Sequence, residues 1–159
     1  MLDGLLFSGT TVLSLDPKGR IALPTKYRQI IKDECEGECY IAKSLFDNCL
    51  WLYPKSQWDS VVSSITKINT LSQNTLRAIQ RTLLGSAVYC KLDAQGRILI
   101  PQELRDICYF DKKAILIGIN NKFEIWSDSA LQDQRKIDAD LLKDLKDSDV
   151  LCALSAISL

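Results

Sequence analysis

Residues 15–24 read LDPKGRIALP, and residues 92–101 read LDAQGRILIP. The two stretches align without a gap. A second pair of blocks, at 47–53 and 120–126, aligns further along, and both of these blocks end in an aromatic residue. Matched blocks in the same order are the signature of an internal repeat, so the chain contains a duplicated module.

Each copy begins with a predicted hairpin. The turn at 16–19 has Asp first, Pro second and Gly fourth, which is typical of a type I turn, and the turn at 93–96 keeps the Asp and the Gly. A glycine at this position tolerates positive φ and suits a hairpin closed by a bulge. On the returning strand, alternation places Ile21 and Leu23 on the apolar face and Arg20 on the other.

A proline closes each hairpin and predicts the start of a helix, at 25–31 in the first copy and at 102–108 in the second. Apolar residues at helical spacing between 58 and 84 predict a helical connector. We therefore expect a first module at 8–55, a connector at 56–84, a second module at 85–128, and a C-terminal helix and tail at 129–159.

Charge is balanced over the whole chain, with 20 basic and 20 acidic residues. This balance argues against a protein that coats nucleic acid without specificity. The distribution is uneven, because 15–32 holds five basic residues against one acid, whereas 91–106 holds three of each. No apolar run approaches the roughly 20 residues of a membrane span, and the N-terminus lacks a basic signal region, so a cytoplasmic protein is expected.

The chain has six cysteines and no histidine. Cys35 and Cys39 form the one close pair, and structural zinc usually needs four Cys or His ligands. Reduced structural thiols are therefore expected, with no metal and no cofactor. The absence of histidine, of a glycine-rich phosphate loop and of clustered metal carboxylates argues against an enzyme.

The duplicated Asp-x-x-Gly-Arg-Ile, with a proline three residues later, resembles the AbrB/SpoVT class of swapped-hairpin modules. Two such copies joined by helices resemble the MraZ family over roughly residues 5–145. The resemblance implies an α+β fold whose swapped hairpins build a β-barrel. It also implies a nucleoid-associated regulator of the division and cell-wall gene cluster, including its own gene, with repression as the expected direction. The implied partners are double-stranded DNA, at G-rich direct repeats near its own promoter, and further copies of the chain in a ring.

The chemistry of the hairpin agrees with this implication, because arginine can pair with guanine O6 and N7 and lysine can contact phosphate. The excess of basic residues at 15–32 predicts that the first copy supplies most of the DNA affinity. The expected DNA-binding residues are Arg20, Lys18, Arg97 and Arg28, and the expected turn residues are Asp16, Gly19, Asp93 and Gly96.

Two alternatives remain open. Asp16 and Arg20 could pair with each other and only fix the turn, as could Asp93 and Arg97, and Arg28 could form a structural ion pair. The protein could also be an antitoxin-like or structural oligomeric module that binds protein without specific DNA recognition.

Overall fold

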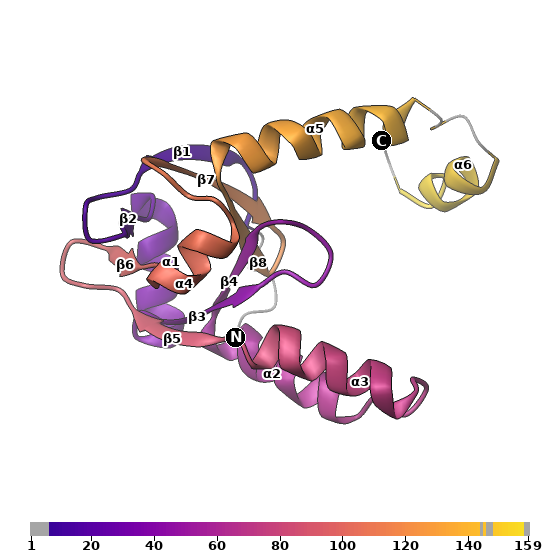
Figure 1. The fold of residues 1–159 in the computed structure, drawn as a ribbon, viewed down its shortest axis with the longest axis horizontal. Helices are drawn as coiled ribbons and strands as arrows, with labels where there is room; N and C mark the ends of the chain where they lie inside the picture. The colour runs from indigo at the N-terminus through magenta and orange to yellow at the C-terminus, as the bar shows by residue number, and fades with distance from the viewer. Residues whose placement is uncertain (1–6, 144, 146–147, 158–159) are drawn as a thin grey trace.

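The computed structural model describes residues 7–143, 145 and 148–157. It is a mixed α+β structure in which antiparallel strands are flanked by helices (Figure 1). In chain order the elements are β1 (Thr10–Ser14), β2 (Arg20–Ala22), α1 (Thr25–Cys35), β3 (Glu38–Lys43), β4 (Leu50–Pro54), α2 (Lys55–Thr66), α3 (Gln73–Ile79), the π-helical turn η1 (Gln80–Leu84), β5 (Val88–Lys91), β6 (Arg97–Leu99), α4 (Gln102–Ile107), β7 (Lys113–Ile119), β8 (Lys122–Trp126), α5 (Asp128–Leu142) and α6 (Ser148–Leu154).

The two repeats exchange strands. The larger sheet has the order β1-β7-β8-β4-β3-β5, so the first strand of each repeat pairs with a strand of the other repeat. Strands β2 and β6, one from each hairpin, pair in a separate two-stranded sheet. Neither repeat can complete its sheet alone, so the two repeats form one intertwined unit.

The resemblance implied a barrel, and the strands that the structure describes form two sheets without a closed ladder. The apolar side chains of both hairpins nevertheless meet in one core. Ile21, Leu23, Ile98 and Ile100 are fully buried in it, as the alternation along each strand predicts. Burying such a side chain contributes about 1.5–3 kcal/mol.

The helices after the hairpins begin directly after Pro24 and Pro101, as predicted. Helix α1 continues to Cys35, beyond the predicted end at residue 31. It ends where Glu36 and Gly37 adopt positive φ and donate their amides to the carbonyls of Lys32 and Ile31. This left-handed ending is a common helix stop, and it places β3 immediately after α1.

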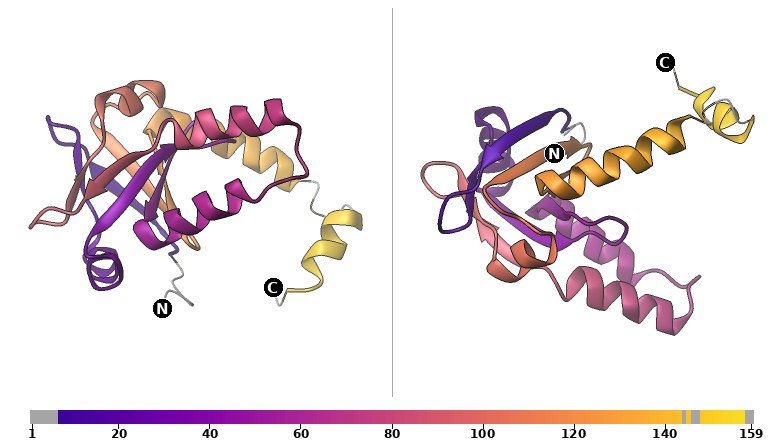
Figure 2. Two further views of the ribbon diagram at one scale, coloured as in Figure 1. Left: turned by 90° about the horizontal axis from the view of Figure 1, so that it is seen from below. Right: turned by 45° about the horizontal axis from the view of Figure 1, so that its top comes forward.

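The molecule has two different ends. The β1–β2 and β5–β6 turns project side by side from one end, and α2, α3 and α5 extend from the other (Figures 1 and 2). In the described ranges no helix combines the length and the apolar character needed to cross a membrane. The hairpin end is therefore a distinct surface to which both repeats contribute.

Candidate nucleic-acid interface

The turn of the first repeat is organised by one carboxylate. Asp16 Oδ1 accepts hydrogen bonds from the backbone amides of Lys18, at 3.0 Å, and Arg20, at 2.8 Å. Its Oδ2 accepts from Arg20 Nε at 2.6 Å. Asp16 thus holds both the backbone of the turn and the arginine that leaves it.

The turn of the second repeat has the same network. Asp93 Oδ1 accepts from the amides of Gln95 and Arg97, each at 2.9 Å, and Oδ2 accepts from Arg97 Nε at 2.8 Å. The glycines have φ values of 88° at Gly19 and 74° at Gly96, as the hairpin prediction required. The two turns are therefore close structural copies.

The carboxylate of each turn is held in its ionised form. Hydrogen bonds from the amide and side chain of Arg20 keep the pKa of Asp16 below its ordinary value, and Arg97 does the same for the pKa of Asp93. Hydrogen bonds to the charged form of an acid favour that form. Each arginine is thus paired with an aspartate at neutral pH, as the turn-fixing alternative expected.

This pairing leaves part of each guanidinium available. The arginine side chains are 29% exposed at Arg20 and 30% at Arg97, so they are not enclosed by the turn. Nε contacts the aspartate, and neither terminal nitrogen, Nη1 or Nη2, hydrogen-bonds to another residue that the structure describes. An arginine fixed through Nε can still present its outer edge to a ligand. Lys18 is exposed at the tip of the first turn.

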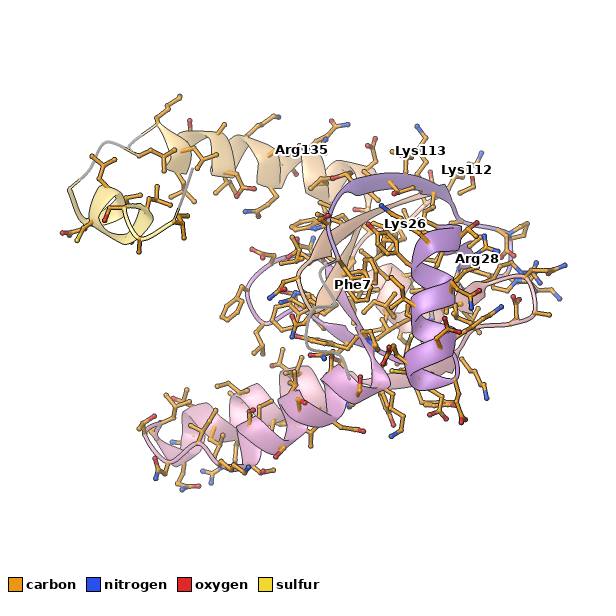
Figure 3. All side chains as sticks on the ribbon, turned by 180° about the vertical axis from the view of Figure 1, so that it is seen from behind. Phe7, Lys26, Arg28, Lys112, Lys113 and Arg135 are labelled. Atoms are coloured by element: carbon orange, nitrogen blue, oxygen red, sulfur yellow. The ribbon has the colours of Figure 1, made fainter. Side chains whose placement is uncertain are left out.

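Arg28 lies on α1, where Figure 3 labels it close to the hairpins. It is half-buried, and it donates from Nε to the carbonyl of Leu23 at 3.0 Å and from Nη1 to that of Gln95 at 2.9 Å. Its partners in the described part of the chain are carbonyl oxygens, not the carboxylate of the expected ion pair. A DNA contact by Arg28 stays a prediction.

Strand exchange brings residues of one repeat to the base of the other repeat's turn. The amide of Leu15 donates to the carbonyl of Lys112 at 2.9 Å, and Ser14 pairs with Lys113. Both lysines are exposed, and Figure 3 labels their side chains. The first turn therefore has further cations beside it, which the charge count of its own repeat missed.

The equivalent position beside the second turn is acidic. The amide of Leu92 donates to the carbonyl of Gly37 at 2.9 Å, and Lys91 pairs with Glu38. Glu36, next to this contact, is exposed. The sequence could not show which residues flank each turn, because the flanking residues come from the other repeat.

Five of the six cysteines are buried, and Cys152 is exposed. Cys39 lies directly opposite Cys90 on strands β3 and β5, and both side chains are buried. A hydrogen bond between the Cys39 thiol and Cys90, together with burial, raises the pKa of the Cys39 thiol. This is the behaviour of small apolar residues rather than of metal-binding thiolates.

One group outside the hairpins has the composition of a cation ligand set. Potential ligand atoms of Asp47, Cys49 and Glu124 lie within 4.8 Å of one another. Burial raises the pKa of the Cys49 thiol, which disfavours the thiolate that a metal requires. These three residues do not by themselves define a metal centre.

Duplicated hairpins, exchanged strands and two aspartate-held arginines on one surface define a class of intertwined tandem-repeat α+β proteins. Residues 6–82 and 83–151 each match the family model described as "MraZ protein, putative antitoxin-like". The chain belongs to the MraZ family.

Relatives from several bacteria agree with this assignment, and each is named "Transcriptional regulator MraZ". The protein of Saccharophagus degradans is 41% identical over 125 residues, which cover 79% of this chain and 84% of the relative. That of Pseudoalteromonas translucida is 42% identical over 136 residues, covering 86% and 89%. That of Pseudomonas aeruginosa is 36% identical over 138 residues, covering 87% and 91%.

Proposed function

We propose that this chain is a transcriptional regulator that binds double-stranded DNA through its two hairpin turns. The names of its relatives support regulation of transcription. The observation that carries the proposal is the pair of aspartate-held arginines, Arg20 and Arg97, which both lie in turns projecting from the same end of the molecule (Figure 2).

The chemistry of recognition follows from these side chains. Arg20 presents its terminal nitrogens to O6 and N7 of a guanine in the major groove, and Asp16 fixes the direction of the guanidinium. Lys18 at the tip contacts phosphate, and Lys112 and Lys113 extend this positive surface along the first turn. Arg97 makes the equivalent but weaker contact from the second turn, where Glu36 and Glu38 oppose an approaching phosphate.

The family resemblance supplies the finer part of the proposal. The exchanged strands support a place among the swapped-hairpin barrels of the AbrB/SpoVT class. We infer that the protein assembles with further copies and binds G-rich direct repeats near its own promoter. There it represses the division and cell-wall gene cluster, in association with the nucleoid. Repeated subunits facing repeated sites raise affinity, because each bound contact increases the effective concentration of the next.

A protein-binding role is the second candidate. Helix α5 leaves the body of the molecule, and Ile137 and Leu141, one turn apart on it, are 54% and 69% exposed. The family description also includes the word antitoxin-like. An apolar stripe of this kind favours a protein partner, so the same chain could act without recognising DNA.

The test compares two arginine variants of the full-length protein. Binding to a duplex from upstream of its own gene is measured by fluorescence anisotropy, with a scrambled duplex of equal length. Arg20→Ala is expected to weaken specific binding by about 1–3 kcal/mol. Arg135→Ala removes an exposed arginine from α5 (Figure 3) and is expected to bind like the wild type. Equal binding of both duplexes, or unchanged binding by Arg20→Ala, would overturn the proposal.

A further inference from the structure

Each repeat places an arginine of its helix against the turn of the other repeat. Arg28, on α1 of the first repeat, donates from Nη1 to the carbonyl of Gln95 in the second turn, at 2.9 Å. Arg105, on α4 of the second repeat, lies against Gly19 of the first turn and donates from Nε to the carbonyl of Ile100 at 2.9 Å. The arrangement is reciprocal, so the two repeats hold each other's turns.

In each case the arginine lies directly over the glycine of the opposite turn. An ideal Cβ at Gly96 would lie 2.6 Å from Arg28 Nε, and one at Gly19 would lie 2.5 Å from Arg105 Cζ. Both glycines are buried although they sit in projecting turns. The arginine side chains therefore fill the space over these glycines and cover the backbone of the turn.

Backbone pairing supports the same crossed link. The amide of Leu23 donates to the carbonyl of Gly96 at 3.0 Å, and the amide of Ile100 donates to that of Gly19 at 2.9 Å. Arg28 Nε donates to the carbonyl of Leu23, so this arginine joins the residue that pairs with the second turn to the tip of that turn.

We propose that Arg28 and Arg105 are crossed positioning residues, in which Arg28 sets the orientation of the second DNA-binding turn and Arg105 that of the first. The part of this inference that concerns DNA binding rests on the proposed function, whereas the part that concerns the orientation of the turns does not. The two turns would then present Arg20 and Arg97 as one rigid unit. We call each of these arginines, with its contact to the turn of the other repeat, a clamp. The clamp on the second turn is the stronger one, since Arg28 donates a hydrogen bond to Gln95 of that turn, whereas Arg105 contacts the first turn by packing against Gly19.

Substitution by lysine distinguishes an arginine that positions the turn from one that contributes only its positive charge. Lysine keeps the positive charge but cannot donate through the planar fork that reaches Leu23 and Gln95 together. A phosphate-contacting Arg28 would tolerate Arg28→Lys, whereas a positioning Arg28 would not. Arg105→Lys provides the matched variant on the other repeat.

The first experiment needs no DNA. Amide hydrogen exchange of the full chain is followed in both turns by NMR. Arg28→Lys should speed exchange about tenfold at 95–97, because a hydrogen bond from a charged donor is lost, and should leave 18–20 unchanged. Arg105→Lys should give the opposite pattern with a smaller change. Wild-type exchange in both variants, or faster exchange in both turns of each variant, would overturn the inference.

The second experiment measures coupling at DNA. Losses of affinity from Arg28→Lys and Arg97→Ala should be less than additive, because Arg28 acts through the turn that carries Arg97. The losses from Arg28→Lys and Arg20→Ala should be additive. The loss from Arg105→Lys should be less than additive with Arg20→Ala and additive with Arg97→Ala. General destabilisation would not produce this crossed pattern, and finding additivity in every pair would overturn the inference.

The two proposals can fail separately. Absence of specific DNA binding in the wild type, with crossed hydrogen exchange intact, removes the proposed function and leaves the clamp. If Arg28→Lys does not fold, the wild type provides the test through solvent exchange of the Arg28 Nε proton. That proton should exchange more slowly than the Nε proton of exposed Arg135, and equal rates would contradict the clamp.

Discussion

The first and second hairpin turns share one backbone geometry and one aspartate–arginine network, but they differ in electrical surroundings. The first carries Lys18 at its tip and is flanked by Lys112 and Lys113, whereas the second carries Gln95 and is flanked by Glu38. Because strands are exchanged, the flanking charges come from the opposite repeat. A duplicated module can thus give its two turns different electrical surroundings partly through residues that lie outside the turns.

The largest expected effect breaks the geometry that the turns share. Gly19→Val and Gly96→Val each force a β-branched residue into positive φ and against an arginine, so each should lower the free energy of unfolding by about 2 kcal/mol or more. Gly9→Val is the control, because Gly9 also has positive φ but an added Cβ would lie 3.9 Å from its nearest neighbour, Tyr27 Oη. Urea unfolding measures all three, and an equal loss at Gly9 would remove the role assigned to the arginine contact.

The next effect separates the turns by their contribution to DNA affinity. Arg20→Ala should cost about 1–3 kcal/mol of specific binding, and Arg97→Ala clearly less, because the acids beside the second turn oppose an approaching phosphate backbone. Anisotropy titrations at one salt concentration give both values. A greater loss from Arg97→Ala would mean that flanking charge does not decide which turn dominates.

Exchanging the residues at the tips of the two turns measures what Lys18 itself contributes to DNA binding. Lys18→Gln gives the first turn the tip of the second, and Gln95→Lys does the reverse. If Lys18 contacts a phosphate, its loss should reduce the slope of log affinity against log salt by about 0.9, and Gln95→Lys should increase that slope by up to the same amount. Titrations at several salt concentrations provide the slopes. An unchanged slope for Lys18→Gln would place this lysine in solvent.

The smallest expected effect concerns acid stability. The folded pKa of Asp16 and of Asp93 lies below the ordinary value of 3.8, so each ionised carboxylate stabilises the protein above that pH. This contribution is lost as pH falls through the folded pKa. Unfolding measured between pH 2 and pH 6 should therefore show a shallower acid loss in the Asp16→Asn, Asp93→Asn double variant than in the wild type. An equally steep loss would show that other carboxylates govern acid unfolding.

Local sequence predicted the parts of the structure that depend on neighbouring residues. The turns with positive-φ glycines, the buried faces of Ile21 and Leu23, and the helix starts after Pro24 and Pro101 are found as predicted. The hairpin prediction is wrong in its pairing, because the strands that flank each turn pair with strands of the other repeat and not with each other. The pairing of Asp16 with Arg20 was an open alternative, and the structure contains it together with an exposed guanidinium edge.

Features that depend on distant pairing could not be predicted in this way. No local pattern shows that β1 pairs with β7, and hence that Lys112 and Lys113 flank the first turn, or that Cys39 faces Cys90. The contact of Arg28 with Gln95 joins residues 67 positions apart. The longer α1 is different, because Glu36-Gly37 is a recognisable helix stop that lies beyond the helix end predicted at residue 31.

Hydrogen exchange of the full-length protein, with and without a duplex from upstream of its own gene, identifies the surface that contacts DNA. We expect slower exchange at 18–20 and around 112–113 on binding, a smaller change at 95–97, and no change along α5. Protection confined to α5 or to α2 and α3, with both turns unaffected, would contradict this expectation.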